Sequence, residues 1–175
     1  MGNRSPDEYF IAGLLAAAVE ILGARGAPAR PEVRLGAAGS SGEVQLLDAR
    51  LVCGRDHLVS AAEHAERAMR EGTNVAKSLA VEFVVYASGE RQIADAPAKM
   101  GIRADTTEFA VAILGGEDQA DVLRALDLVR DDAVLEPTPT KLRSFGLTDA
   151  EIASVPPDRA SDLVLERVAL VDLLK

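Results

Sequence analysis

The stretch Glu108-Phe-Ala-Val-Ala-Ile-Leu114 decides the fold of this chain. Its apolar run, Phe109–Leu114, indicates a central β-strand that is covered on both faces. Gly115 and Gly116 end the run with a turn. The strand predicts an α+β fold, in which helices pack on both faces of a small mixed β-sheet, within a single domain over residues 1–175.

Downstream of this strand, the pattern predicts a helix over 117–129 and a short edge strand over Ala133–Leu135, which Pro137 stops. Thr138 and Pro139 begin the next helix, because proline is tolerated in a first turn where its missing amide costs nothing.

The C-terminal part of the chain has two further helix signals. Thr148-Asp-Ala-Glu151 is a capping box, which predicts a short helix that Pro156 and Pro157 then break. Asp158 is the expected cap of the last helix. That helix has a wide apolar face, made of Ala160, Leu163, Val164, Val168, Val171 and Leu174.

Upstream of the central strand, weak alternation predicts a strand over Glu43–Cys53. A helix follows, with Asp56 as its N-cap and Gly72 at its C-terminal end. The segment Asn74–Ala87 fits a buried strand and a helix equally well, since its apolar residues also recur at helical spacing.

The first 42 residues are predicted as a helix, a linker and a possible strand. Residues 6–23 form the helix, which Gly23 and Gly26 end, and it buries most of its faces. The linker covers Ala27–Pro31, and the possible strand covers Glu32–Gly36, followed by a Gly- and Ser-rich turn.

Composition limits the class of protein. Apolar residues make up 48% of the 175 residues, which is enough for a sizeable aliphatic core, but no run is long enough to span a membrane. Cys53 is the only cysteine, which suits a reducing cytoplasm and a small core residue. The net charge of −9 opposes general nucleic-acid binding, although residues 55–103 hold seven cations and seven anions.

No catalytic, metal or cofactor motif stands out. His57 and His64 are seven residues apart, whereas two histidines that share a metal on a helix are three or four apart, so we expect a surface or capping role. Neither Ser88 nor Ser40 and Ser41 lies in a nucleophile elbow. Gly115-Gly116 lacks the rest of a dinucleotide fingerprint. We expect no cofactor and no enzymatic activity.

One segment resembles a known family. Ala87-Ser88-Gly89-Glu90-Arg91-Gln92-Ile93, together with Leu47–Gly54, Gly72–Ala76 and Leu163–Leu170, is similar to the small accessory subunit of KEOPS. This archaeal and eukaryotic complex makes threonylcarbamoyladenosine on tRNA, and its eukaryotic subunit is the PRPK-binding protein. The resemblance covers residues 43–175, which form the family-like core, while residues 1–42 are divergent.

The resemblance implies a helix over Asn74–Ala87 that Gly89 ends, and a short helix over Arg91–Met100, which Pro97 would kink. It also implies a cytoplasmic, non-catalytic subunit. Such a subunit docks on the kinase-like ATPase subunit of KEOPS, meets the threonylcarbamoyl transferase subunit through the complex, and binds the 3′ CCA end of tRNA.

The resemblance also indicates which residues to expect at each partner. The RNA-binding residues that it implies are Arg67, Asn74, Lys77, Ser88, Arg91 and Gln92. Arginine offers a planar fork for phosphate, and glutamine offers a donor and an acceptor for a base edge. Apolar candidates for the docking surface are Leu135, Leu147, Val164 and Val168. Each could equally belong to the core, and the helical stripe that contains Val164 and Val168 favours the core for these two.

Two other interpretations remain open. A pure scaffold would bind the kinase-like subunit without touching RNA, and Arg91 and Gln92 would then be ordinary turn residues. A small-molecule-binding or hydrolytic enzyme would use carboxylates such as Glu82 or Asp105, and it would show a deep pocket in which acids converge.

Overall fold

A four-stranded antiparallel sheet organises the computed structural model, which describes residues 19–27, 44–90 and 99–174. The strand order is β2-β3-β1-β4. The strands are β1 (Glu20–Arg25), β2 (Val44–Asp48), β3 (Glu108–Ile113) and β4 (Val129–Arg130). As expected, β3 is an interior strand, since β1 and β2 flank it with Val111 opposite both Leu22 and Leu46.

Helices lie between and after the strands along the chain. The 3₁₀ helix η1 (Ala49–Leu51) leads into α3 (Arg55–Glu71) and α4 (Leu79–Ser88), and α6 (Gln119–Leu126) follows β3. The remaining helices are η2 (Asp132–Leu135), α7 (Pro139–Phe145), α8 (Asp149–Ala153), η3 (Pro157–Arg159) and α9 (Asp162–Leu174).

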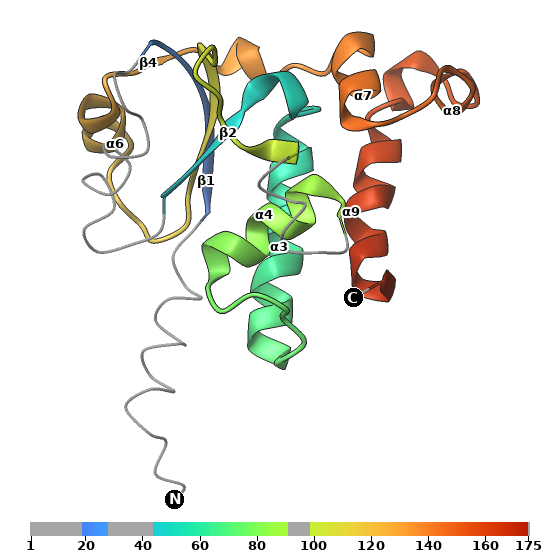
Figure 1. The fold of residues 1–175 in the computed structure, drawn as a ribbon, viewed down its shortest axis with the longest axis horizontal. Coiled ribbons are helices and arrows are strands. Elements are labelled where there is room, and N and C mark those ends of the chain that lie inside the picture. Colours follow the sequence, from blue (N-terminus) through green and yellow to red (C-terminus); the bar gives the residue numbers. More distant parts are fainter. Residues whose placement is uncertain (1–18, 28–43, 91–98, 175) are drawn as a thin grey trace, which may run out of the picture.

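The two faces of the sheet bury different side chains. On one face, Ala110 and Ala112 of β3 pack with α3 and α4, and these small residues let the helices approach the sheet closely. On the other face, Phe109, Val111 and Ile113 pack against α6. Figure 1 shows α6 on one side of the sheet and α3, α4 and α9 on the other. The structure therefore confirms the α+β fold with helices on both faces.

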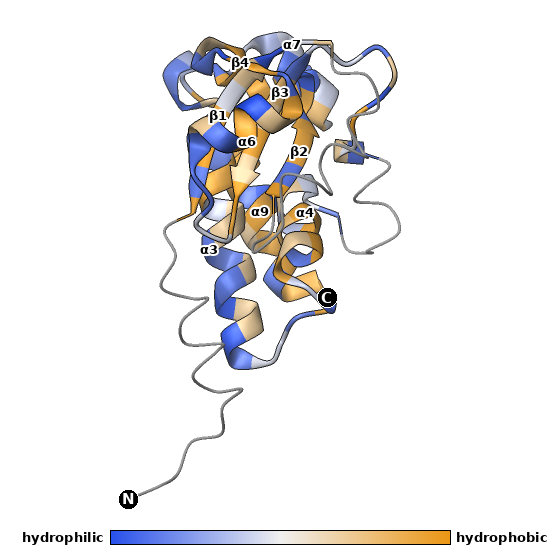
Figure 2. Ribbon diagram, turned by 90° about the vertical axis from the view of Figure 1, so that its left-hand side faces the viewer, coloured by the Kyte–Doolittle hydropathy of each residue, from blue (hydrophilic) through white to orange (hydrophobic). Residues whose placement is uncertain are grey.

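The C-terminal helices add a third apolar cluster around Phe145, in which Leu142 and Leu147 meet Val164 of α9 and the buried Cys53. Side-chain oxygens of Thr138 and Thr148 cap α7 and α8, and the predicted capping box between Thr148 and Glu151 is present. In Figure 2, most of α4 and α9 is coloured as hydrophobic, whereas α3 has a hydrophilic outer side.

The N-terminal prediction is wrong where the structure tests it. Glu20–Gly23 was expected at the end of a helix, but it lies in β1, whose residues pair with β3 from Glu20↔Ile113 to Arg25↔Glu108. Gly23 allows close packing there, since a Cβ atom would come within 2.4 Å of the Asp131 carbonyl oxygen. The described strand pairs are all antiparallel rather than mixed. Residues 32–36 lie outside the described part of the chain.

Several boundaries also differ. The strand predicted to reach Cys53 ends at Asp48, and Gly54 rather than Asp56 precedes α3. The helix predicted over 117–129 ends at Leu126, where Asp127 is left-handed, because the chain turns to pair β4 with β1.

Two predictions near the C-terminus are wrong. Ala133–Leu135 belongs to the 3₁₀ helix η2, while the short edge strand is Val129–Arg130. Asp158 lies in η3 instead of capping α9, because Pro156 and Pro157 favour a separate turn before that helix begins.

Candidate functional site

The segment on which the family resemblance rests leaves α4 at its C-terminal end. Gly89 is left-handed, with φ of 66°, and its amide donates to the Tyr86 carbonyl. A Cβ atom at Gly89 would lie 3.4 Å from Phe145 of α7 and 3.5 Å from Arg167 of α9. Glycine therefore meets two demands here, the backbone conformation and the close approach of two other helices.

Lys99, which follows this segment in the chain, binds to the same C-terminal end of α4. Its ammonium donates to the Ser88 carbonyl at 2.7 Å and to the Glu90 carboxylate at 2.9 Å. It also lies over the Phe145 ring, 4.3 Å from the ring centroid. A cation is favourable at this place because the last carbonyls of a helix lack internal partners and its C-terminal end is negative.

Two of the predicted RNA-binding residues, Arg91 and Gln92, lie between these anchors, outside the described residues, as does Pro97. Ser88 is described, and its side chain is fully buried. Its hydroxyl donates to the Val85 carbonyl at 2.7 Å and accepts from the Glu90 amide at 3.0 Å. The Ser88 side chain therefore shapes the end of α4, and the role of this residue in RNA binding stays a prediction.

His57 joins the start of α3 to the same end of α4. Its Nδ1 accepts from the Cys53 amide at 3.2 Å, and its Nε2 lies 2.8 Å from the Ala87 carbonyl, so the ring is the neutral Nε2–H tautomer. Complete burial lowers the pKa of His57 to about 4, outweighing the opposing hydrogen bond to Ala87. The expected capping role holds, but the ring lies in the core rather than on the surface.

The opposite end of α4 contains Asn74 and Lys77, in the loop from α3. The Asn74 side chain donates to the Ala76 carbonyl, and Lys77 is exposed. Glu82 is fully buried beneath this loop and accepts from the Val75 amide at 3.0 Å and the Ala76 amide at 2.8 Å. Since α4 has ten residues, about 15 Å of helix separate this loop from Ser88.

Arg67 is joined to α9. Its Nη2 lies 2.5 Å from the Asp172 carboxylate, which also meets His64 Nδ1 at 2.8 Å and the Tyr86 hydroxyl. Burial raises the pKa of Tyr86, and its bond to Asp172 raises that pKa further. The Arg67 side chain remains 41% exposed, but its charge is paired within the protein. Among the described candidates, the structure therefore separates Ser88 from Asn74 and Lys77 by the length of α4.

None of the four docking candidates presents its side chain to a partner. Leu135 and Leu147 are 4% exposed, and Val164 and Val168 are completely buried. Leu135 packs in the sheet-facing core and Leu147 in the C-terminal cluster, so these docking assignments are corrected to core positions.

The structure also shows an exposed apolar face on α9 that the sequence pattern did not identify. While Val164, Val168 and Val171 of this helix are buried, Leu170, Leu173 and Leu174 are 43%, 79% and 41% exposed. The sequence signal for this exposed face is that α9 is apolar on both sides, whereas a surface helix normally has one polar face. Only the packing shows which of these leucines remain uncovered.

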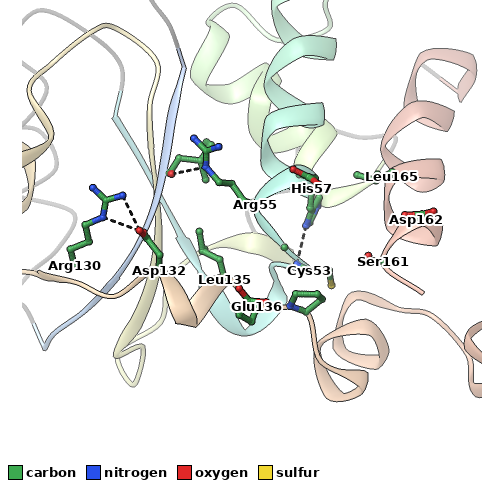
Figure 3. A pocket seen from close by; sticks show the side chains of 14 residues that line it. Cys53, Arg55, His57, Arg130, Asp132, Leu135, Glu136, Ser161, Asp162 and Leu165 are labelled. Atoms are coloured by element: carbon green, nitrogen blue, oxygen red, sulfur yellow. Dashed lines mark hydrogen bonds and ion pairs between the residues drawn. The ribbon is translucent and has the colours of Figure 1, made fainter. Parts of the chain in front are cut away.

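A cleft of about 400 Å³ lies where the N-terminal ends of α3 and α9 approach β1 and η2 (Figure 3). Cys53, Arg55 and Asp162 are among its lining residues. The Arg55 guanidinium donates to the Ile21 carbonyl at 3.3 Å. Asp132 on the other side accepts from the Gly23 amide and pairs with Arg130. Burial raises the pKa of the Cys53 thiol to about 12, which disfavours the reactive thiolate.

The carboxylates of the enzymatic interpretation do not meet in this cleft. Glu82 bonds to backbone amides at the far end of α4, and Asp105 pairs with Arg50 on the surface. Among the residues that the structure describes, no group of three or more His, Cys, Asp or Glu side chains is arranged to hold a metal ion. Within the same residues, no helix has the length and apolar character needed to cross a bilayer.

The described residues form a small α+β domain with an exposed apolar face on α9. The match with a known family is specific, since the family model for the kinase-binding protein CGI-121 matches residues 31–171. The chain belongs to this family of kinase-binding proteins, as its resemblance to the KEOPS accessory subunit predicts. No curated protein matches the sequence. The family match begins after β1, although β1 is an interior strand of the sheet.

Proposed function

We propose that this chain docks on the kinase-like subunit of KEOPS and holds the single-stranded 3′ CCA end of tRNA for threonylcarbamoyladenosine synthesis. The observation that carries this proposal is the end of α4, where the chain reaches the surface at Gly89 and Glu90 directly before Arg91 and Gln92. In this role the chain performs no chemistry, and it meets the transferase subunit through the assembled complex.

The charge of the chain favours a single-stranded end over duplex RNA. A net charge of −9 opposes the many phosphate contacts that duplex binding requires. A CCA end needs fewer such contacts, because unpaired bases are recognised through stacking and their hydrogen-bonding edges. Arg91 supplies a fork for phosphate, and Gln92 supplies a donor and an acceptor for a base.

For the kinase-like subunit, we propose the α9 face formed by Leu170, Leu173 and Leu174. These leucines are neighbours on the last two turns of α9, and their exposure in one cluster is unusual for a protein surface that has no partner. Arg167 and Glu166 lie on the same helix and are exposed, which gives the apolar face a polar border.

The scaffold without RNA contact remains the second candidate, and a specific observation favours it. Arg67, one of the described residues expected to bind RNA, is already paired with Asp172. If the remaining surface has no other phosphate partner, docking alone would be the function of the chain.

Fluorescence anisotropy of the purified chain with one tRNA, intact and without its CCA end, tests the two candidates at two salt concentrations. Binding that requires CCA supports the proposed function, while equal or no binding supports the scaffold. Two variants separate the two surfaces. We expect Arg91→Glu to lose RNA binding but keep the kinase-like subunit, and Leu173→Glu to do the reverse. Unchanged RNA binding by Arg91→Glu would refute the role of Arg91.

A further inference from the structure

Lys99 joins two parts of the chain that are eleven residues apart at the proposed RNA-binding segment. Its ammonium contacts the Ser88 carbonyl, the Glu90 carboxylate and the face of the Phe145 ring. Ser88 is the last residue of α4, Glu90 directly precedes Arg91, and Phe145 belongs to α7. One side chain therefore connects three places in the fold.

Partial burial and several partners restrict the position of the Lys99 ammonium group more than an ordinary surface ion pair would. The Lys99 side chain is 23% exposed and the Glu90 side chain 37% exposed, so water screens the pair only in part. The Ser88 carbonyl is one of the groups at the C-terminal end of α4 that lack a partner within the helix. The aromatic ring attracts a cation over its face. Three different partners thus favour one position for the ammonium group.

The ion pair with Lys99 also determines the charge that Glu90 presents to RNA. Without Lys99, the Glu90 carboxylate would be an uncompensated negative charge at the end of α4, and it would repel the phosphates of an approaching RNA. The ammonium group of Lys99 offsets this charge and holds Glu90 at the end of α4.

We propose that Lys99 is a positioning residue for RNA binding: it fixes Glu90 against the end of α4 and so offsets a negative charge that would repel the nucleic acid. This inference rests on the proposed function. It assigns Lys99 a role through Glu90 rather than through a contact of its own with RNA.

The test measures the affinity of four variants for a fluorescent tRNA that ends in CCA, and for the same RNA without that end. We expect Lys99→Met to weaken CCA-dependent binding about tenfold, the loss of roughly one charge-assisted contact. Lys99→Arg keeps a cation and should bind nearly as well as the original chain. Arg124→Met removes the same charge from α6, on the other face of the sheet, and should not change binding.

The fourth variant separates positioning from a direct contact. In Lys99→Met combined with Glu90→Gln, the uncompensated carboxylate is gone, so we expect most of the RNA affinity to return. If the double variant binds as weakly as Lys99→Met, Lys99 acts in another way and the inference fails. An equal loss in Arg124→Met would also overturn it, since only net charge would then matter.

Two further measurements keep this result distinct from misfolding and from failure of the proposed function. Binding of the kinase-like subunit should be the same for all four variants, and a parallel loss there would assign Lys99 to fold stability and refute the inference. If Lys99→Met binds normally while Arg91→Glu does not, the inference fails but the proposed function stands. If neither variant changes RNA binding, the proposed function fails as well.

Discussion

The two ends of α4 are stabilised by opposite means. At its N-terminal end, the buried Glu82 carboxylate accepts from two loop amides, and Ser78 caps the first turn. At its C-terminal end, the carbonyls of Ala87 and Ser88 are met by the neutral His57 ring and the ammonium of Lys99. Acceptors are needed at one end of a helix and donors at the other, because the free backbone groups differ.

The two ends of α4 also differ in whether function can be separated from stability. Glu82 has no exposed surface, so its bonds serve only the fold. Lys99 is partly exposed and closes the end of α4 that continues into Arg91 and Gln92. A surface contact of this kind can change without loss of the core, whereas a buried carboxylate cannot.

The largest effect is expected from Glu82→Ala. It removes two hydrogen bonds to a buried anion and leaves the amides of Val75 and Ala76 without this acceptor, which should cost about 4 kcal/mol of unfolding free energy. Urea unfolding measures the change, with Glu63→Ala on the exposed side of α3 as the control. Glu82→Gln, which keeps one acceptor oxygen, should fall between them. A small loss in Glu82→Ala would contradict the importance of this end of the helix.

At the other end of α4, the stability should depend on pH through His57. The unfolded chain takes up this proton near pH 6.5 and the folded chain only near 4, because burial lowers the pKa. The unfolded state therefore binds more protons between these values, and stability falls as the pH drops from about 6.5 to about 4. The loss from this group is at most about 3 kcal/mol.

Urea unfolding at a series of pH values, for the original chain and His57→Asn, isolates this contribution. The variant should be less stable at pH 7 and should have a flatter pH dependence below 6.5. An unchanged pH dependence in His57→Asn would show that carboxylates alone cause the acid sensitivity.

The smallest effect concerns the two left-handed glycines that end α3 and α4. Gly72 and Gly89 have φ of 70° and 66°, but a Cβ atom would meet nothing within 4 Å at Gly72. Replacement of either by alanine should cost about 1 to 2 kcal/mol from backbone strain. Gly89→Ala should cost slightly more, because a Cβ atom there would lie 3.4 Å from Phe145 and 3.5 Å from Arg167, at the short end of van der Waals contact. Thermal unfolding measures the difference, and equal losses would mean that this helix junction is loosely packed.

The sequence predicted best those elements whose signals are local. Thr138 and the Thr148 capping box mark helix starts through contacts within one turn, and they lie where expected. The apolar run of β3 was recognisable as an interior strand for a similar reason, since it needed no knowledge of its partners. The helical choice for Asn74–Ala87 required the family resemblance, and α4 confirms it over Leu79–Ser88.

Nonlocal contacts explain the failures. The residues of β1 were predicted as helix because a short apolar segment fits either structure, and only pairing with β3 selects the strand. Apolar periodicity favoured the core for Val164 and Val168, which are buried, but it did not distinguish a docking surface from the core for Leu135 and Leu147. The burial of Ser88 and the pairing of Arg67 with Asp172 depend on helices distant in sequence.

The family, the fold class and the helix starts at Thr138 and Thr148 thus followed from the sequence alone, because caps, turns and apolar runs act over a few residues. The side chains that remain available to a partner became known only from the packing of the whole fold. It buries Leu135 and Leu147, exposes Leu173, and brings Lys99 to the end of α4. The exposure of a side chain depends on all of the residues that pack around it, and many of these are distant in sequence, so a local pattern cannot predict it.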